Sequence, residues 1–201
     1  TLDEFLNTTG TEDLFQQVLE RMEEDYSQKS IRNVMTLLWS ARSGLSEEEL
    51  AGLTGVSRLK LSTMLLGLDF HLVRRDGLLT FFHDYLRRAI EKRYLSEEAS
   101  VRAVRLRLAD YFKRELALTL AEGTTGSSRN ALRRLGLELA FQFQACEAWE
   151  ELRDCLVSIP VFVSLYVDDT AYEVNAYWSR LRQLFDLEST YLDALDRWEA
   201  S

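Results

Sequence analysis

The stretch FHLVRRDGLLTFF, residues 70–82, constrains the fold most, because it interrupts a chain whose apolar residues otherwise recur at helical spacing. Two runs rich in β-forming residues flank Asp76 and Gly77. An Asp-Gly pair at this place supplies the positive φ values that a two-residue hairpin turn requires. We therefore expect a β-hairpin over residues 70–82 that turns at Asp76-Gly77.

Three short helices are expected before this hairpin. The ranges 30–44, 46–55 and 57–68 each begin with a serine that can cap a helix, and the first two end at a glycine. Three helices followed by a hairpin is the order of a winged helix, and a fourth helix is expected from about Asp84. We expect its core to include Leu38, Trp39, Leu50, Leu65, Leu66 and Phe81.

Beyond residue 96 the pattern is helical to the end of the sequence. Helices are expected at about 130–144, 147–158, 170–186 and 188–199, and the stretch EGTTGSSRN, residues 122–130, is expected to be a loop. The fold class is therefore mainly α: a winged helix followed by an α-helical bundle or a solenoid-like arm. Residues 1–29 would end a preceding helical domain or form a linker, residues 30–95 the winged-helix domain and residues 96–201 a helical connector domain.

The net charge of −9 is unevenly distributed, since residues 1–30 carry −6, 31–95 carry +3, 96–144 carry +2 and 145–201 carry −8. Acidic flanks do not favour binding to a phosphate backbone. No apolar run approaches the length of a membrane span, so we expect no membrane partner. Cys146 and Cys155 lack the spacing of a metal knuckle and are expected to be reduced, buried thiols of a cytoplasmic protein.

The residues needed for common catalytic sites are missing from the sequence. It has two histidines, and it has no metal-ligand cluster, no G-x-S-x-G, no G-x-G-x-x-G and no G-x-x-x-x-G-K-[ST] phosphate loop. The acidic neighbours Asp168 and Asp169 are better explained as a solvated helix start than as an acid and base pair. We expect the chain by itself to be no enzyme, to hold no metal and to bind no cofactor.

A free-standing winged helix that binds DNA or a partner protein is the alternative function. The candidate DNA contacts are Arg58 and Lys60 in the second helix of the helix-turn-helix and Arg74 and Arg75 in the wing. That helix is otherwise apolar, and three glutamates at 47–49 precede it. We therefore do not expect nucleic acid binding.

Three segments carry a family resemblance: LFQQVLERMEEDY, IRNVMTLLWSARSGLSEEELAGLTGVS and LVRRDGLLTFFHDYLRRAIEKRYL. Together they resemble the region that follows the nucleotide-binding core in NACHT-type STAND signalling ATPases, especially the nephrocystin and telomerase-associated kind that continues into tetratricopeptide or WD repeats. The resemblance covers residues 11–95. It implies that the chain is a piece of a longer protein, whose Walker A loop, Walker B carboxylates and arginine sensor would precede Thr1.

The resemblance assigns a role to His83, which stands in the F-H-D position of the family. There the histidine would contact the diphosphate of bound ADP in the closed state, with Asp84 as the N-cap of the following helix. The alternative is a partly buried histidine that bonds a backbone carbonyl. ADP or ATP would belong to the parent protein, the partners would be the upstream NACHT core and downstream helical repeats or a protein partner, and residues 96–201 would join them.

Overall fold

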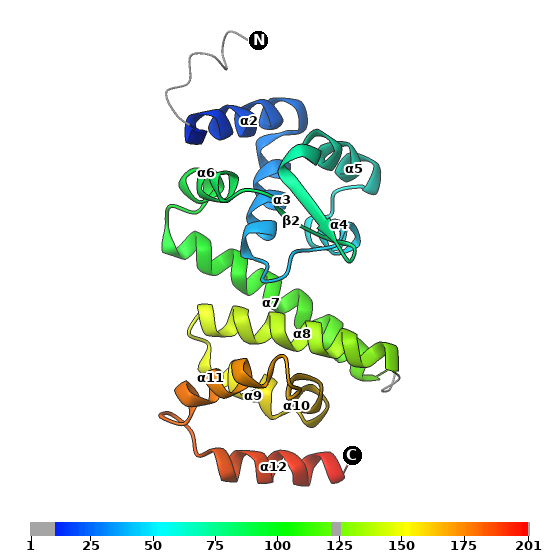
Figure 1. Cartoon of the computed structure of the whole chain (residues 1–201), viewed down its shortest axis with the longest axis vertical. Helices are drawn as coiled ribbons and strands as arrows, with labels where there is room; N and C mark the ends of the chain where they lie inside the picture. The colour runs from blue at the N-terminus through cyan, green and yellow to red at the C-terminus, as the bar shows by residue number, and fades with distance from the viewer. Residues whose placement is uncertain (1–10, 122–125, 201) are drawn as a thin grey trace. The chain divides into compact units, whose positions relative to one another are not determined.

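The computed structural model describes residues 11–121 and 126–200, which form mainly helices and one small two-stranded sheet (Figure 1). The chain divides into two compact units, one ending at Leu108 and the other beginning at Ala109. The boundary falls inside helix α7 (Glu98–Ala121), whereas the sequence suggested boundaries after residues 29 and 95. Along the described residues, no helix combines the length and apolarity needed to cross a membrane.

The first unit is built around one buried helix. Its elements are α2 (Thr11–Tyr26), α3 (Gln28–Ser40), α4 (Glu47–Thr54), α5 (Arg58–Gly67), the 3-10 turn η1 (Asp69–His71), β1 (Leu72–Arg75), β2 (Leu78–Phe81), α6 (Asp84–Tyr94) and the start of α7. Helix α3 contacts α2, α4, α6 and β2. Its apolar side chains from Ile31 to Trp39 are buried, and each stabilises the unit by roughly 1.5–3 kcal/mol through the hydrophobic effect.

The predicted bounds of α3 were wrong at both ends. The helix begins at Gln28 with Ser27 at the N-cap, because the amide of Ile31 already donates to the carbonyl of Ser27 at 3.1 Å. It ends at Ser40, so Gly44 does not close it. Gly44 lies in the following loop at φ +88°, where the chain turns toward the hairpin.

The caps of α4 and α5 are confirmed. Ser46 and Glu49 form a capping box, in which the Glu49 amide donates to Ser46 Oγ at 3.1 Å and the Ser46 amide donates to Glu49 Oε2 at 2.8 Å. Gly55 ends α4 in the left-handed conformation, and the Ser57 side chain accepts from the Lys60 amide at the start of α5. These contacts join residues that are close together in the sequence, so the sequence alone could predict them.

The hairpin is confirmed with its turn at Asp76-Gly77, whose φ angles are +51° and +80°. Strands β1 and β2 pair in antiparallel register from Leu72 opposite Phe81 to Arg75 opposite Leu78. An isolated bridge ties the hairpin to the loop after α3, because Leu45 and Leu79 exchange two backbone hydrogen bonds of 3.2 and 2.8 Å. The element order predicted for residues 30–95 is therefore observed.

Of the six predicted core residues, Leu38, Trp39, Leu50 and Leu65 are buried. Phe81 is half-buried, and Leu66 is wrong, because its side chain is 75% exposed. Helix α5 buries Leu61, Met64 and Leu65 on one face, and Leu66 turns to the opposite face. A helix with leucines around most of its circumference does not reveal which of them face the core.

The second unit is entirely helical over its described residues. It holds the end of α7 with α8 (Gly126–Ala145), α9 (Trp149–Val157), α10 (Ile159–Leu165), α11 (Ala171–Leu181) and α12 (Leu187–Glu199). Residues 126–130 belong to α8, which corrects the predicted loop, while 122–125 lie outside the described residues. Helix α10 was not predicted, and α11 ends at Leu181, five residues earlier than expected.

The core of the second unit lies between α8, α9 and α10, which contact one another. Gly136 of α8 permits close packing, because a Cβ there would lie 2.9 Å from Val161 Cγ1 of α10. Cys146 and Cys155 are buried, as expected. Burial, with a smaller contribution from Asp154, raises the pKa of the Cys155 thiol to about 12, so this thiol stays protonated and unreactive at neutral pH.

Candidate functional site

His83 lies where the hairpin meets helix α6. It occupies the N-cap position of α6 with extended backbone angles of −125° and 140°, and its side chain is exposed and makes no hydrogen bond to the helix. The Phe82 ring lies against the imidazole with 4.2 Å between ring centroids. The alternative of a partly buried histidine does not match this exposure. The imidazole is therefore accessible at the end of a helix where backbone amides lack partners.

The predicted N-cap role of Asp84 is wrong by one residue. Asp84 is the first residue within α6, and the cap itself is His83. The Asp84 carboxylate still lies in the first turn, where a negative charge interacts favourably with the helix dipole. The sequence favoured Asp84 because aspartate is among the commonest N-cap residues.

The second histidine, His71, lies near His83, a proximity that the sequence did not predict. The Phe82 amide donates to the His71 carbonyl at 2.9 Å, and this bond brings η1 beside the end of β2. The His71 ring is half-buried and packs edge-on against Phe15 of α2 with 5.4 Å between centroids. Burial, followed by the charge of His83, lowers the pKa of His71.

The lowered pKa of His71 predicts a stability that depends on pH. Because the folded chain holds His71 neutral more strongly than the unfolded chain does, its contribution is complete above the unfolded value near 6.5 and is lost as the pH falls below that value. We expect urea denaturation from about pH 7.5 to about pH 5.5 to show falling stability. His71→Asn should flatten this slope. An unchanged slope in His71→Asn would assign the dependence to other groups.

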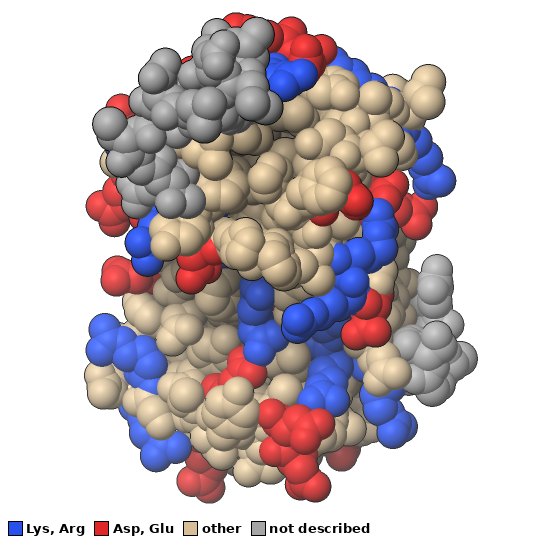
Figure 2. All heavy atoms as spheres, turned by 45° about the horizontal axis from the view of Figure 1, so that its top comes forward, with Lys and Arg blue, Asp and Glu red and all other residues tan. Residues whose placement is uncertain are grey.

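The four candidate DNA contacts do not form a free basic surface. Arg58 pairs with Glu48 at 2.8 Å, Arg74 pairs with Glu47, and Lys60 Nζ lies 3.5 Å from Ser30 Oγ. Arg75 is exposed at the end of β1. Figure 2 shows acidic and basic side chains lying close together on the face that it draws. The pairing of two arginines with α4 lowers the positive potential that DNA binding needs.

The outward face of α5 carries exposed leucines beside Ser62 and Thr63, where a DNA-reading helix presents basic and amide groups. Leu59 is 81% exposed, Leu66 lies seven residues further along the same face, and Phe70 in η1 is 90% exposed. This surface and the ion pairs of Arg58 and Arg74 both disfavour the DNA alternative.

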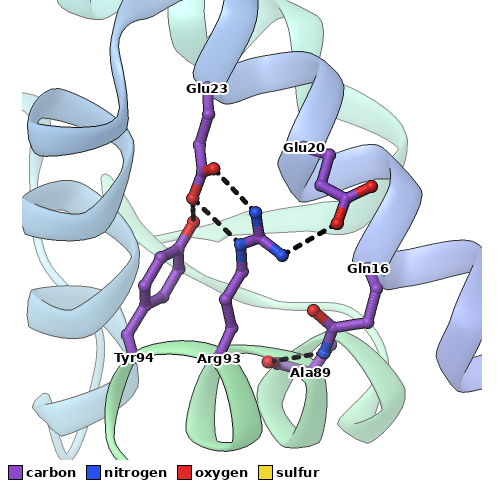
Figure 3. A network of polar contacts seen from close by, with 6 residues as sticks. All are labelled: Gln16, Glu20, Glu23, Ala89, Arg93 and Tyr94. Carbon is purple, nitrogen blue, oxygen red and sulfur yellow. Dashed lines mark hydrogen bonds and ion pairs between the residues drawn. The ribbon is translucent and has the colours of Figure 1, made fainter.

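A polar network joins α2 to α6 (Figure 3). The Arg93 guanidinium binds both oxygens of Glu23 at 3.0 and 2.7 Å and reaches Glu20 at 3.1 Å. The Tyr94 hydroxyl also donates to Glu23, and Gln16 Nε2 donates to the Ala89 carbonyl at 3.0 Å. We call these residues the α2–α6 network. It holds α2 against the helix that begins next to His83.

The charges of the network are mutually stabilised. The hydrogen bond from Arg93 outweighs burial and, with that from Tyr94, lowers the pKa of the Glu23 carboxyl. Burial and the same carboxylate raise the pKa of Tyr94, so its hydroxyl keeps its proton. The sequence did not predict this network, because α2 was assigned to a preceding domain and its acidic residues resemble a solvated helix face.

Among the side chains that the structure describes, no group of three or more histidine, cysteine, aspartate or glutamate residues could hold a metal ion. The chemistry available around His83 is that of a hydrogen-bond donor beside a helix N-terminus. This arrangement can bind an anion, and it does not assemble a nucleophile with a base.

The comparisons with known proteins are sparse. No family model matches the chain, and no solved structure matches it significantly. It is similar to a TPR repeat-containing protein of Dictyostelium discoideum, with 22% identity over 184 residues. The alignment covers 89% of this chain and 10% of that protein, so the chain spans about a tenth of the length of its relative.

Proposed function

We propose that the chain is a non-catalytic regulatory and protein-interaction region of a STAND-type ATPase. In this proposal the first unit is a winged helix that docks on an upstream NACHT core, and the second unit is a helical arm that contacts downstream repeats or a partner. The observation that carries the proposal is the exposed imidazole of His83 at the N-terminus of α6. The resemblance of residues 11–95 to this class of protein is the reason to expect that the ligand of His83 is a nucleotide.

The chemistry of this position suits a phosphate group. The first amides of α6 lack intrahelical partners and carry the positive end of the helix dipole, and the imidazole adds an N–H donor. The phosphate loop would come from the core, because this sequence has no G-x-x-x-x-G-K-[ST] motif. His83 would then contact ADP only while the first unit is docked.

Helix α6 and the α2–α6 network can link the docked, ADP-bound state of His83 to the rest of the first unit. His83 occupies the N-cap position at one end of α6, and Arg93 and Tyr94 at the other end hold Glu23 of α2. A single short helix moves as a rigid element. The proposed switch is therefore docking and release of the unit as a rigid body.

The interaction role of the second unit is supported by its helical pairs and by the name of its relative. Helix α9 contacts α11 and α12, and α10 contacts α12. The relative is described as TPR repeat-containing, and TPR repeats are helical pairs that stack to form extended binding surfaces. We therefore assign protein binding, not catalysis, to this unit.

The proposal is tested in the longer protein that joins this chain to its nucleotide core. His83→Ala should speed the release of a fluorescent ADP analogue by roughly ten-fold, because a hydrogen bond to a charged group of the closed state is lost. Release is measured by stopped-flow fluorescence. In the 201-residue chain itself the substitution should leave the free energy of unfolding nearly unchanged, since the side chain is exposed.

Arg88→Ala is the matched control, because Arg88 is exposed on the same helix and lies one turn further from the cap. It should leave ADP release unchanged. If His83→Ala releases ADP no faster than Arg88→Ala, His83 is no nucleotide sensor. A longer protein without a phosphate loop upstream of Thr1 would contradict the whole proposal.

A further inference from the structure

Helix α10 presents an apolar face on the side away from its core. Ile159, Phe162, Val163 and Tyr166 recur at the i, i+3, i+4 and i+7 spacing of one helix face, while Val161, Ser164 and Leu165 are buried on the other. Val163 is 58% exposed and Tyr166 is 49% exposed. Exposed apolar residues gathered on one face mark an interaction surface more often than single exposed residues do.

Helix α12 contributes a second apolar face beside it. A hollow of about 450 Å³ is lined by Ile159 of α10 and by Leu187, Glu188, Tyr191, Leu192 and Leu195 of α12. The Phe162 and Tyr191 rings meet edge-on with 5.2 Å between centroids, which joins the two faces. We call this hollow, defined by its six lining residues, the α10–α12 groove. Its side from Leu187 to Leu195 extends for about two turns of helix.

Tyr191 gives this groove a fixed wall. Its hydroxyl donates to the Leu156 carbonyl at 3.2 Å and accepts from Trp178 Nε1 at 3.0 Å. Both bonds reach into the core of the second unit, so the ring cannot turn away without breaking them. A surface that is already ordered loses less conformational entropy when a partner binds.

The surroundings of the groove are acidic. Glu188 lines it, and Glu199 lies eleven residues, about three helical turns, further along the same face of α12. Residues 159–175 contain three acidic residues and no basic one, and residues 186–200 contain five acidic residues and one basic residue, Arg197. Arg197 lines a different hollow together with Ala194 and Trp198. A complementary partner must therefore be positively charged.

We propose that the α10–α12 groove binds an amphipathic helix of another protein, with an apolar stripe flanked by lysine and arginine. Two antiparallel or crossing helices leave a groove that accepts a third helix through its i, i+3, i+4 and i+7 side chains. A second copy of the acidic surface would place like charges together. The inference rests on the protein-interaction role proposed above and adds the site and the partner's chemistry.

The test uses the 201-residue chain and two labelled peptides. One is an amphipathic peptide of about 14 residues in which leucines at helical spacing alternate with lysines, and the other has glutamate in place of lysine. Fluorescence anisotropy should show saturable binding of the lysine peptide that weakens with salt, and no binding of the glutamate peptide. No binding of the lysine peptide, or equal binding of both, would overturn the proposal.

Variants locate the binding. Leu192→Asp should weaken binding of the lysine peptide by about ten-fold or more, since Leu192 is 55% exposed and its loss removes an apolar contact in the groove. Leu59→Asp is the matched control, because it changes an exposed leucine of the first unit. If both substitutions weaken binding equally, the peptide does not use the groove.

Charge reversal gives a second, independent readout that does not remove an apolar side chain. In Glu188→Lys/Glu199→Lys the preference should change from the lysine peptide to the glutamate peptide. If light scattering shows that the unchanged chain is a dimer and that Leu192→Asp is a monomer, the groove binds a second copy of the chain, and the proposal is overturned. None of these measurements uses a nucleotide, so their failure is separate from failure of the ADP-release test of His83.

Discussion

Gly44→Ala is expected to destabilise the first unit by about 2–4 kcal/mol, more than the other glycine-to-alanine substitutions discussed below. Gly44 has a φ of +88°, which is costly for alanine, and a Cβ there would overlap the Leu79 carbonyl oxygen and lie 2.6 Å from Thr80 Cγ2. That carbonyl cannot move freely, because it accepts the Leu45 amide at 3.2 Å. Urea denaturation followed by circular dichroism measures the loss.

Gly55→Ala and Gly77→Ala separate the two causes. Both glycines have positive φ, +68° and +80°, and a Cβ at either position would meet nothing within 4 Å. Each should therefore show only the conformational cost of about 1 kcal/mol. If Gly44→Ala costs no more than these controls, the contact between the Gly44 loop and the hairpin does not stabilise the fold.

Gly44 also shows which contacts the sequence could not predict. The hairpin turn and the caps of α4 and α5 were predictable, because Asp76-Gly77 and Ser46 with Glu49 act on neighbouring residues. The role of Gly44 depends on Leu79, which is 35 positions away, so a glycine after a helical stretch was interpreted as the end of that helix. Its position after a helical stretch drew attention to this glycine, but its contact with Leu79 determines its role in the fold.

Helix α10 was missed for a related reason. Its sequence IPVFVSL is rich in β-branched and aromatic residues and contains the only proline of the chain. Pro160 lies in the first turn, where a proline is compatible with a helix because the missing amide has no intrahelical partner. Packing of Val161 and Leu165 against Gly136 of α8 then outweighs the weak helix propensity.

At the candidate site the sequence left two alternatives for His83, an exposed sensor or a partly buried histidine, and the structure shows an exposed side chain. The nearby His71 was not predictable, because its ring packs on Phe15 of a distant segment and its charge interaction with His83 depends on the folded chain. The same holds for α2, whose acidic residues pair with Arg93, about 70 positions away. Which carboxylate meets which arginine is a property of packing, and residue types alone do not determine it.

Arg93→Met is the second large effect that we expect, a loss of about 2–3 kcal/mol in the free energy of unfolding. The Glu23 side chain is only 11% exposed, and the Arg93 side chain is 22% exposed. Removing the guanidinium leaves the Glu23 carboxylate in that partly buried place with Tyr94 as its remaining partner in the network. Methionine keeps most of the side-chain volume, so the loss reports the charge and the hydrogen bonds. Thermal and urea denaturation measure it.

The pH dependence of this loss distinguishes the network from general packing. Because Arg93 lowers the pKa of Glu23, the network stabilises the fold above the unfolded value near 4.5, and this contribution is lost as the pH falls through the lower, folded value. The free energy of unfolding of Arg93→Met should therefore be lower than that of the unchanged protein at neutral pH, and the two values should converge in acid.

Arg88→Met, on the exposed side of the same helix, should cost little at any pH. A constant difference between Arg93→Met and the unchanged protein across this range would mean that the loss does not come from the pairing of Arg93 with the ionised Glu23 carboxylate. The electrostatic link from α2 to α6 would then not stabilise the fold.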